Sequence, residues 1–386
     1  MSKEKKIMSI ILVMVFMLFT VCLNIPEAAA DKTIKIGGIY PLTGYLAWLG
    51  EYYKKAAILK VDQINKSGGV NDHTLELVTY DDKSSPEEAV RLAKRLILKD
   101  KAIAIIGCAT APITASVASI VRKHKIPVVA ASGYDVKPEK DHFIFNTAPQ
   151  TYFAASRAFS YLKKEGTNRI AFLMAMGALG EVGIANGKKA AEKYGLTIIG
   201  TERFDTKAPE VTAQLAKLRA LKPEAIFSFS TGKPAALVAR NMAQMKFNVP
   251  LVVSHGNGIP GFLKLTSGLP TRIIVPSVKI MVCKSLSDDD PAKPILEKFN
   301  KEHINAYGEP ANIISTSSAD NISLVAEGIR LSSSTDPQKI RDGIEAIKNF
   351  VGLNGVYNLS STDHYGTRIE DMILLTVKDG KWKKIE

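Results

Sequence analysis

The sequence predicts an α/β protein with two doubly wound lobes, each built on a parallel sheet. The stretch Lys35–Asp82 has the pattern of a strand, a crossover helix and a second strand, and this alternation continues along the chain. A second series of the same kind begins near residue 150. Two strands joined through a helix lie parallel in one sheet, with helices on its faces. Each series therefore predicts one parallel sheet, and 386 residues suit two domains of ordinary size.

In the first unit, Thr33–Ile39 is a β-rich run and Tyr40–Gly44 is a loop containing Pro and Gly. The helix that follows extends to Asn65 and repeats apolar residues at helical spacing. A Ser-Gly-Gly turn then leads to the strand Thr74–Tyr80. The loop after the first strand lies at the carboxyl edge of the sheet, where open α/β sheets bind ligands.

The remaining elements follow in the same way. The first series continues with helix Pro86–Lys99, strand Ile103–Gly107, helix Ile113–His124 and strands Ile126–Ala130 and Phe143–Asn146. The second series consists of helices Tyr152–Glu165, Val182–Tyr194, Pro209–Leu221 and Pro234–Met245, and of strands Arg169–Met174, Thr197–Phe204, Ala225–Phe229 and Leu251–Val253. The chain then continues with strand Ile273–Val275, helices Pro291–Ala306, Ile313–Leu331 and Pro337–Asn349, and β segments Gly355–Leu359 and Ile369–Lys378.

The N-terminal residues are typical of a secretory signal peptide. Three lysines precede the apolar run Ile7–Leu23, and Ala28–Ala30 supplies an A-x-A cleavage site. An uncleaved anchor is the alternative, but the run is shorter than the about 20 residues that a membrane span needs. Lipid attachment at Cys22 is a second alternative, although Val rather than a small residue precedes it. We expect cleavage after residue 30 and a periplasmic or other extracytoplasmic protein.

Net charge and cysteine content bear on whether the protein binds nucleic acid and whether it forms a disulfide. The net charge is +13, but the lysines are spread over helix faces rather than clustered with aromatic residues. This pattern favours a solvated basic surface over a nucleic-acid-binding one. After cleavage two cysteines remain, Cys108 and Cys283. An exported compartment permits a disulfide, but no local pattern brings the two together, so we expect free, buried thiols.

Several short motifs resemble the type I periplasmic binding proteins, in particular the leucine/isoleucine/valine-binding family of ABC transporter substrate-binding proteins. The first unit carries PLTG at Pro41–Gly44, an INxxGG turn and a strand that ends in YDD at Tyr80–Asp82. Near the other end, residues 351–367 read VGLNGVYNLSSTDHYGT, and Ser254–Gly256 read SHG. These resemble a subgroup that includes binders of aromatic carboxylic acids.

The resemblance implies two Rossmann-like lobes joined by three crossover segments. We place the crossings near Thr147, Val278 and Gly355. This predicts a first lobe of residues 31–147 plus 279–354 and a second lobe of residues 148–278 plus 355–386. The family implies a monomer that delivers a small molecule to an ABC permease in the membrane.

Loops that follow strands supply the candidate ligand groups. Thr110 and Ala111 stand between the strand Ile103–Gly107 and a helix, where free backbone N–H groups can bind an anion. A plain helix cap at Thr110 is the alternative. Ser132 and Tyr134 follow the next strand. By resemblance, these two loops hold the carboxylate of the ligand: a family serine matches Ala111, a family threonine matches Tyr134, and a family alanine matches Ser132.

The second lobe contributes the remaining candidates. By resemblance, Leu179 and Thr231 match two tyrosines of the family, and His255 matches the glutamate that pairs with the ammonium group of the ligand. A buried ammonium without a carboxylate partner costs several kcal/mol, so His255 favours an acid or a neutral oxygenated ligand over an amino acid. A structural histidine in a Gly-rich turn is the alternative. Trp48 and Tyr45 provide an aromatic wall, or else pack on the surface.

The motifs of common enzymes are missing from the sequence. It contains no G-x-S-x-G, no H-E-x-x-H and no Cys-x-x-Cys, and its six histidines show no metal-ligand spacing. We therefore expect no enzymatic activity, no cofactor and no metal site. The predicted function is capture of a small carboxylate-bearing solute for an importer. Binding of a branched-chain or other amino acid in the usual family way, and ligand sensing for a separate receptor, remain alternatives.

Overall fold

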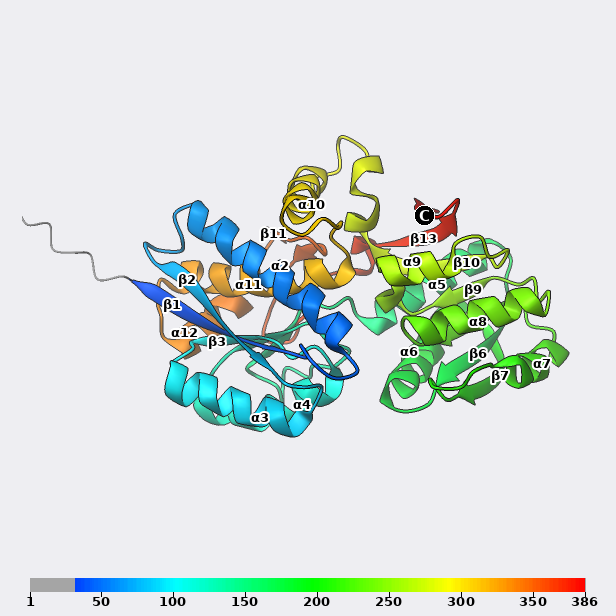
Figure 1. Ribbon diagram of the computed structural model, residues 1–386, viewed down its shortest axis with the longest axis horizontal. Coiled ribbons are helices and arrows are strands. Elements are labelled where there is room, and N and C mark those ends of the chain that lie inside the picture. Colours follow the sequence, from blue (N-terminus) through cyan, green and yellow to red (C-terminus); the bar gives the residue numbers. More distant parts are fainter. Residues whose placement is uncertain (1–31, 386) are drawn as a thin grey trace, which may run out of the picture.

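The computed structural model describes residues 32–385 and contains two α/β lobes side by side (Figure 1). The predicted signal peptide, residues 1–30, lies outside the described residues. The first sheet has the strand order β2-β1-β3-β4-β5, and all its strands are parallel. Its strands are β1 (Thr33–Tyr40), β2 (Thr74–Asp81), β3 (Ala104–Gly107), β4 (Val128–Ala130) and β5 (Ile144–Asn146).

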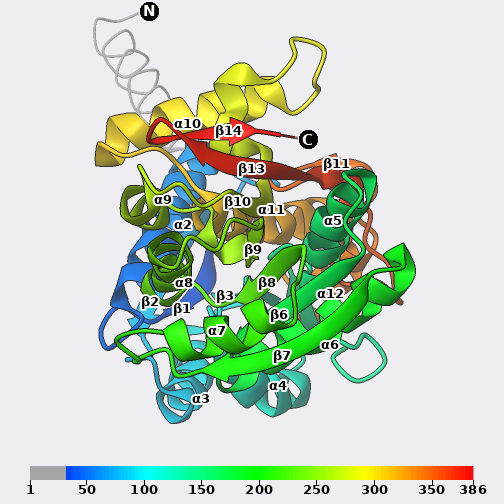
Figure 2. The ribbon, with the colours of Figure 1, turned by 90° about the vertical axis from the view of Figure 1, so that its right-hand side faces the viewer.

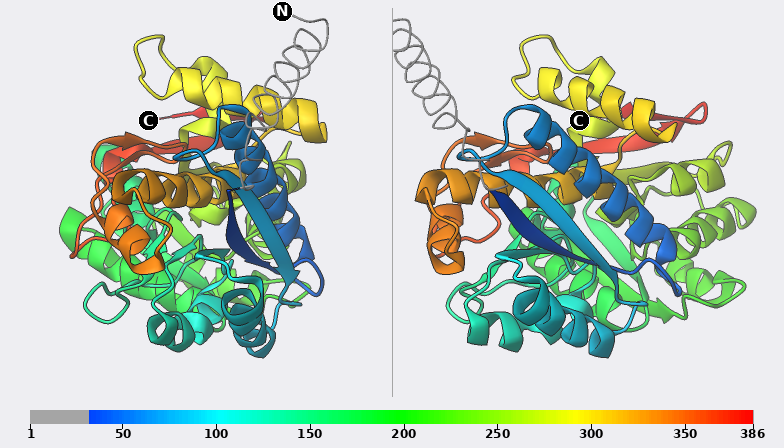
Figure 3. Two further views of the ribbon diagram at one scale, coloured as in Figure 1. Left: turned by 90° about the vertical axis from the view of Figure 1, so that its left-hand side faces the viewer. Right: turned by 60° about the vertical axis from the view of Figure 1, so that its left-hand side comes forward.

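Helices cover both faces of this sheet (Figure 3). Side chains alternate between the two faces: on β3, Ile105 packs with one pair of helices and Ile106 with the other. The pair packed with Ile106 is α2 (Ala47–Lys66) and α11 (Ile313–Ser332), and the pair packed with Ile105 is α3 (Pro86–Arg95) and α4 (Ala111–His124). On the outside of α11 lies α12 (Pro337–Glu345), while α10 (Lys293–Tyr307) contacts α2.

The second sheet has the order β14-β13-β10-β9-β8-β6-β7. Its first five strands along the chain are parallel, and β13 and β14 add an antiparallel edge (Figure 2). The strands are β6 (Arg169–Ala175), β7 (Thr197–Phe204), β8 (Ala225–Phe229), β9 (Leu251–Val253), β10 (Ile273–Val278), β13 (Met372–Lys378) and β14 (Lys381–Lys384). One face packs with α5 (Thr151–Lys164) and α6 (Ala178–Tyr194), the other with α7 (Thr212–Ala220), α8 (Lys233–Gln244) and α9 (Pro260–Thr266).

The chain passes between the lobes more than once. It leaves the first sheet after β5 and enters α5, and it returns after β10 through the 3-10 segment η4 (Lys279–Ser285). Residues 358–366 still bond to the first lobe: His364 Nδ1 lies 2.8 Å from the Ile144 carbonyl oxygen, and the Tyr365 hydroxyl donates to the Tyr134 carbonyl at 2.7 Å. Pairing in the second sheet resumes at Met372. We therefore propose a third boundary near residue 367 rather than at Gly355.

The predicted α/β class is confirmed. The observed helices and strands differ from the predicted ones in where they begin and end. The helix predicted over Pro86–Lys99 is an α-helix to Arg95 followed by a π-helical segment, η2 (Leu96–Asp100). The helix predicted from Val182 already begins at Ala178, because Gly177 with φ of 91° turns the chain there. The β segment Gly355–Leu359 is reduced to β12 (Val356–Tyr357), which pairs with β11 (Phe350–Val351).

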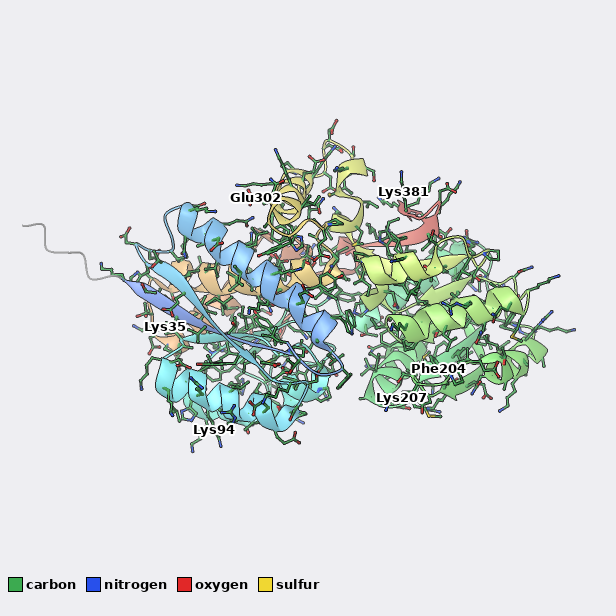
Figure 4. The ribbon with its side chains drawn as sticks, in the orientation of Figure 1. Lys35, Lys94, Phe204, Lys207, Glu302 and Lys381 are labelled. Atoms are coloured by element: carbon green, nitrogen blue, oxygen red, sulfur yellow. The ribbon has the colours of Figure 1, made fainter. Side chains whose placement is uncertain are left out.

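Basic side chains lie on different sides of the molecule, as Lys35, Lys94, Lys207 and Lys381 illustrate (Figure 4). Cys108 and Cys283 are both free and buried, as expected. No helix within residues 32–385 combines the length and the apolar character that a membrane span requires.

Candidate ligand-binding site

A cavity of about 490 Å³ lies between the two lobes, within the size range of small-molecule sites. The loops that line it lie at the point in each sheet where the strand order reverses. In the first sheet β1 pairs with β2 on one side and with β3 on the other, and the loops after β1 and β3 both reach the cavity. In the second sheet the same holds for the loops after β6 and β8. Two topological switch points therefore face each other, the arrangement by which doubly wound sheets form ligand crevices.

The cavity brings together most of the residues that the sequence singled out. Those that line it are Trp48, Thr110, Ala111, Ser132, Leu179, Thr231 and His255. Tyr45, the second residue of the expected aromatic wall, lines it as well and is 78% exposed, whereas Trp48 is 39% exposed. On the opposite lobe Met176 and Leu179 are 57% and 43% exposed. Large apolar side chains thus stand exposed on both walls.

Tyr134 does not line this cavity. Its hydroxyl donates to the carboxylate of Asp141 at 3.1 Å, and burial together with this carboxylate raises the pKa of Tyr134 to about 12. Its backbone N–H donates to Ser132 Oγ at 3.3 Å. The backbone N–H and the hydroxyl of Tyr134 are therefore both engaged within the protein.

Ser132 lines the cavity, but its polar groups are also engaged. Its N–H donates to Asn146 Oδ1 at 3.2 Å, and its hydroxyl lies 2.9 Å from Thr114 Oγ1. The Thr114 hydroxyl donates to the Cys108 carbonyl at 2.8 Å, so Ser132 is the donor in the pair. Ser132 thereby holds the loop after β4 against α4 and leaves the neighbouring backbone facing the cavity.

The N-terminus of α4 offers free backbone groups. Thr110 is the N-cap, and its hydroxyl oxygen accepts from the Ile113 N–H at 3.5 Å. Pro112 has no N–H. Among residues 32–385, no partner accepts from the N–H of Ala111 or of Gly133, and both residues line the cavity. These two N–H groups come from the two loops that the sequence assigned to an anion.

Other helices also direct their N-terminal ends at the cavity. Lining residues lie at the first turn or N-cap of α2, α5 and α6, and Thr231 directly precedes the N-cap of α8. None of these four helices has a side-chain cap. A helix N-terminus carries a partial positive charge and unpaired N–H groups. These N-termini therefore contribute partial positive charge at the cavity that comes from the backbone rather than from lining side chains.

The lining itself carries no formal charge. No Asp, Glu, Lys or Arg belongs to it among the described residues. Burial lowers the pKa of His255 to about 4, so its imidazole is neutral at pH 7. The Nδ1 atom of His255 is buried without a hydrogen-bond partner in the described part of the chain. The lining therefore contains no carboxylate that could neutralise an ammonium group.

Some lining residues were not predicted from the sequence. Ser317 on α11 and Tyr53 on α2 lie inside helices, where nothing in the sequence distinguishes a cavity-facing side chain from a core one. Ser254 directly follows the predicted strand Leu251–Val253 and adjoins His255, and Met176 lies two residues after the predicted strand Arg169–Met174. The position after a strand is the signal that could have identified these two.

The fold and the cavity define a two-lobed solute-binding protein. The family described as "Periplasmic binding protein" matches residues 33–381, and the chain belongs to it. It is similar to the leucine-, isoleucine-, valine-, threonine- and alanine-binding protein of Pseudomonas aeruginosa, with 22% identity over 321 residues that cover 82% of this chain and 83% of the relative. The expected likeness to the leucine-binding family is thus confirmed, and members of the family are binding proteins rather than enzymes.

Solved structures show the same fold. An extracellular ligand-binding receptor from Rhodopseudomonas palustris HaA2 superposes with a TM-score of 0.83 at 23% identity, covering 92% of this chain and all of that one. The branched-chain amino acid transporter substrate binding protein LivJ from Streptococcus pneumoniae, in complex with isoleucine, gives a TM-score of 0.78 at 23% identity, covering 91% and 98%. At this identity the likeness establishes the fold, here the two-lobed type I architecture.

Proposed function

We propose that this protein is the exported substrate-binding component of an ABC importer of the branched-chain amino acid type. It captures a small carboxylate-bearing solute between its lobes, outside the cytoplasm, and delivers it to a membrane permease. The observation that carries the ligand class is an uncharged cavity ringed by uncapped helix N-termini. Such a site attracts an anion and offers nothing to neutralise an ammonium group.

In this proposal the carboxylate binds to the first lobe. It accepts from the free N–H groups of Ala111 and Gly133, and the α4 N-terminus adds its partial charge. The apolar body packs against Trp48 on one wall and Leu179 on the other. A ligand that contacts both lobes binds the closed form better than the open form, so it shifts the hinge equilibrium toward closure. The closed form is the one that docks on the permease.

An amino acid is the second candidate, because relatives bind amino acids by name. The two candidates differ at His255, which the resemblance aligns with a glutamate. A neutral imidazole can accept one hydrogen bond from an ammonium group but cannot neutralise its charge. None of the described lining residues carries a carboxylate. This favours an acid over an amino acid as the ligand.

Three experiments test the proposal. Mass spectrometry of the small molecule released by denaturation of the purified protein should identify a carboxylate without an α-ammonium group. Calorimetric titration should show that 3-phenylpropanoate binds at least about tenfold more tightly than its uncharged amide, 3-phenylpropanamide, since a charged hydrogen bond is worth about 1.5–3 kcal/mol. Small-angle scattering should show a smaller radius of gyration with the acid bound. Equal affinity of acid and amide would contradict the proposed anion site.

A further inference from the structure

The second-lobe wall of the cavity contains a connected set of polar side chains whose function is not yet assigned. Thr231 and Ser254 line the cavity and lie in the loops after β8 and β9. Their hydroxyl oxygens are 3.1 Å apart. Behind them lies Asn257, which is fully buried. The direction of the hydrogen bonds in this set decides what the wall presents to a ligand.

A serine or threonine hydroxyl has one proton and can accept two hydrogen bonds. The Ser254 hydroxyl lies 2.9 Å from the Ser230 carbonyl oxygen, which can only accept, so the proton of Ser254 is used there. Asn257 Nδ2 donates to the Ser230 carbonyl at 2.9 Å and to the Ser254 carbonyl at 3.0 Å, and it lies 3.1 Å from Ser254 Oγ. With the proton of Ser254 on the Ser230 carbonyl, Thr231 Oγ1 is the donor in its contact with Ser254. This assignment satisfies every group in the set, and it leaves Thr231 without a proton for the cavity.

The neighbouring backbone fixes this arrangement. Asn257 Oδ1 accepts from the N–H of Gly232 at 2.8 Å, which ties the loop after β8 to the loop after β9. Gly256 packs so closely that a Cβ there would lie 3.1 Å from Thr231 Oγ1 and 3.3 Å from its methyl carbon. The Thr231 side chain is thus held between Gly256 and Ser254. Its oxygen presents lone pairs to the cavity, with no further partner in the described residues.

We infer that the second-lobe wall selects a ligand with a neutral hydrogen-bond donor, such as a hydroxyl group, at the end opposite its carboxylate. Thr231 Oγ1 is the acceptor, and Ser254 and Asn257 are positioning residues that keep the proton of Thr231 turned away. This inference rests on the proposed function, because the carboxylate fixes which end of the ligand reaches the second lobe. A neutral donor satisfies Thr231 without the cost of burying an ammonium group.

The test uses matched carboxylates that differ only at the far end. The probes are 4-hydroxybenzoate, (4-hydroxyphenyl)acetate and 3-(4-hydroxyphenyl)propanoate, each with its 4-methyl and 4-methoxy counterpart, so that three lengths are sampled. For the length that binds most tightly, the hydroxyl probe should bind about tenfold better than the methyl probe, as expected for one hydrogen bond. The methoxy probe, which can only accept, should bind no better than the methyl probe.

Variants then assign the selectivity to Thr231. Thr231→Val should reduce the hydroxyl-to-methyl preference from about tenfold to near one, while Thr231→Ser should retain it. Ser254→Ala frees the proton of Thr231 and should raise the affinity for the methoxy probe relative to the hydroxyl probe, a change in ratio that a general loss of structure does not produce. Thr271→Val, in which the lost hydroxyl donates to the Ala239 carbonyl away from the cavity, is the matched control and should keep the wild-type ratio.

The outcomes separate the two proposals. If carboxylates bind but hydroxyl and methyl probes bind equally, or if the preference survives in Thr231→Val, the inference about the second-lobe wall is overturned and the proposed function stands. If the methoxy probe binds best to the wild type, Thr231 is a donor and the assignment is reversed. If none of the carboxylates binds more tightly than its uncharged amide, the proposed function fails and the inference fails with it.

Discussion

At the scale of single residues, the site depends on which polar groups are already satisfied. The sequence could place Thr110, Ser132 and His255 at the cavity because each follows a strand in a doubly wound pattern. It could not show that Tyr134 turns its hydroxyl to Asp141, since a partner seven residues away is decided by the fold of the loop. The position after a strand therefore indicates which loops reach the cavity, whereas the hydrogen-bonding role of each residue requires the structure.

His255 provides the first prediction at this scale. His255→Glu introduces a carboxylate into a cavity without formal charge, and His255→Gln is the matched neutral control. Binding of 4-methylpentanoate should be at least about tenfold weaker in His255→Glu than in His255→Gln, because two like charges face each other at low dielectric. Leucine should bind better to the Glu variant than to the wild type. Calorimetric titration at pH 7 measures both. Equal affinity of the two variants for the acid would place the carboxylate far from residue 255.

Asp82 provides a prediction about pH. This side chain is fully buried at the end of the YDD motif, and burial raises its pKa from 3.8 to about 6. The folded state therefore retains a proton that the unfolded chain loses, so stability falls as pH rises from about 4 to about 6. The cost at pH 7 is about 3 kcal/mol. Asp82→Asn should raise the free energy of unfolding at pH 7.5 by about 1–2 kcal/mol, less than the full cost because its amide N–H₂ lacks a partner.

The neighbouring carboxylate is the control for this pH effect. Burial acts to raise the pKa of Asp81, but hydrogen bonds from Thr43, Lys83 and Leu42 lower it overall. Its contribution to stability is present above its unfolded pKa and is lost as pH falls below that value. Asp81→Asn should therefore destabilise the protein at pH 7.5. Urea unfolding of both variants at pH 4 and pH 7.5 measures the difference. A gain from Asp82→Asn that is as large at pH 4 would refute the assignment.

At the scale of elements, the helix α11 joins segments of the first lobe that are far apart in the sequence. Thr147, in the first crossing, donates to the Ser317 carbonyl at 2.9 Å, and Asn354 Nδ2 donates to Ser317 Oγ at 2.8 Å. Ser317 also lines the ligand cavity. The sequence predicts α11 well, as Ile313–Leu331 against the observed Ile313–Ser332, but its many buried polar residues have no period that would reveal these partners. Long-range hydrogen bonds between segments some 170 residues apart depend on topology.

Asp320 is the residue of α11 with the largest expected effect on stability. Its buried carboxylate accepts from the N–H groups of Leu353 and Asn354 and from the Tyr357 hydroxyl at 2.9–3.0 Å. Asp320→Asn replaces one acceptor by a donor that faces other donors, and it should lower the free energy of unfolding by about 2–4 kcal/mol. Tyr357→Phe removes one of these bonds and should cost less. The exposed Asp289→Asn is the control. Urea denaturation gives the values, and an Asp320→Asn loss below about 0.5 kcal/mol would contradict this account.

At the scale of the whole molecule, the two lobes place two topological switch points on either side of one cavity. The sequence predicted both doubly wound series from strand and helix alternation. The number of crossings came from family resemblance, because local patterns do not reveal which lobe a segment joins. Residues 358–366 illustrate this limit, since they bond to the first lobe although they lie just before a second-lobe strand. The convergence of several helix N-termini on the cavity likewise could not be predicted from the sequence, because these helices are far apart along the chain.

The most direct test of the uncharged, anion-binding cavity compares ligands that differ only by an α-ammonium group. Leucine and 4-methylpentanoate form one such pair, and phenylalanine and 3-phenylpropanoate form another. Calorimetric titration of the ligand-free protein at pH 7 should give at least about tenfold tighter binding for the acid in the pair that fits better, because the cavity accommodates a carboxylate and cannot neutralise an ammonium group. Leucine binding with a dissociation constant of about 1 μM or below (roughly −8 kcal/mol), and tighter than 4-methylpentanoate, would contradict the account.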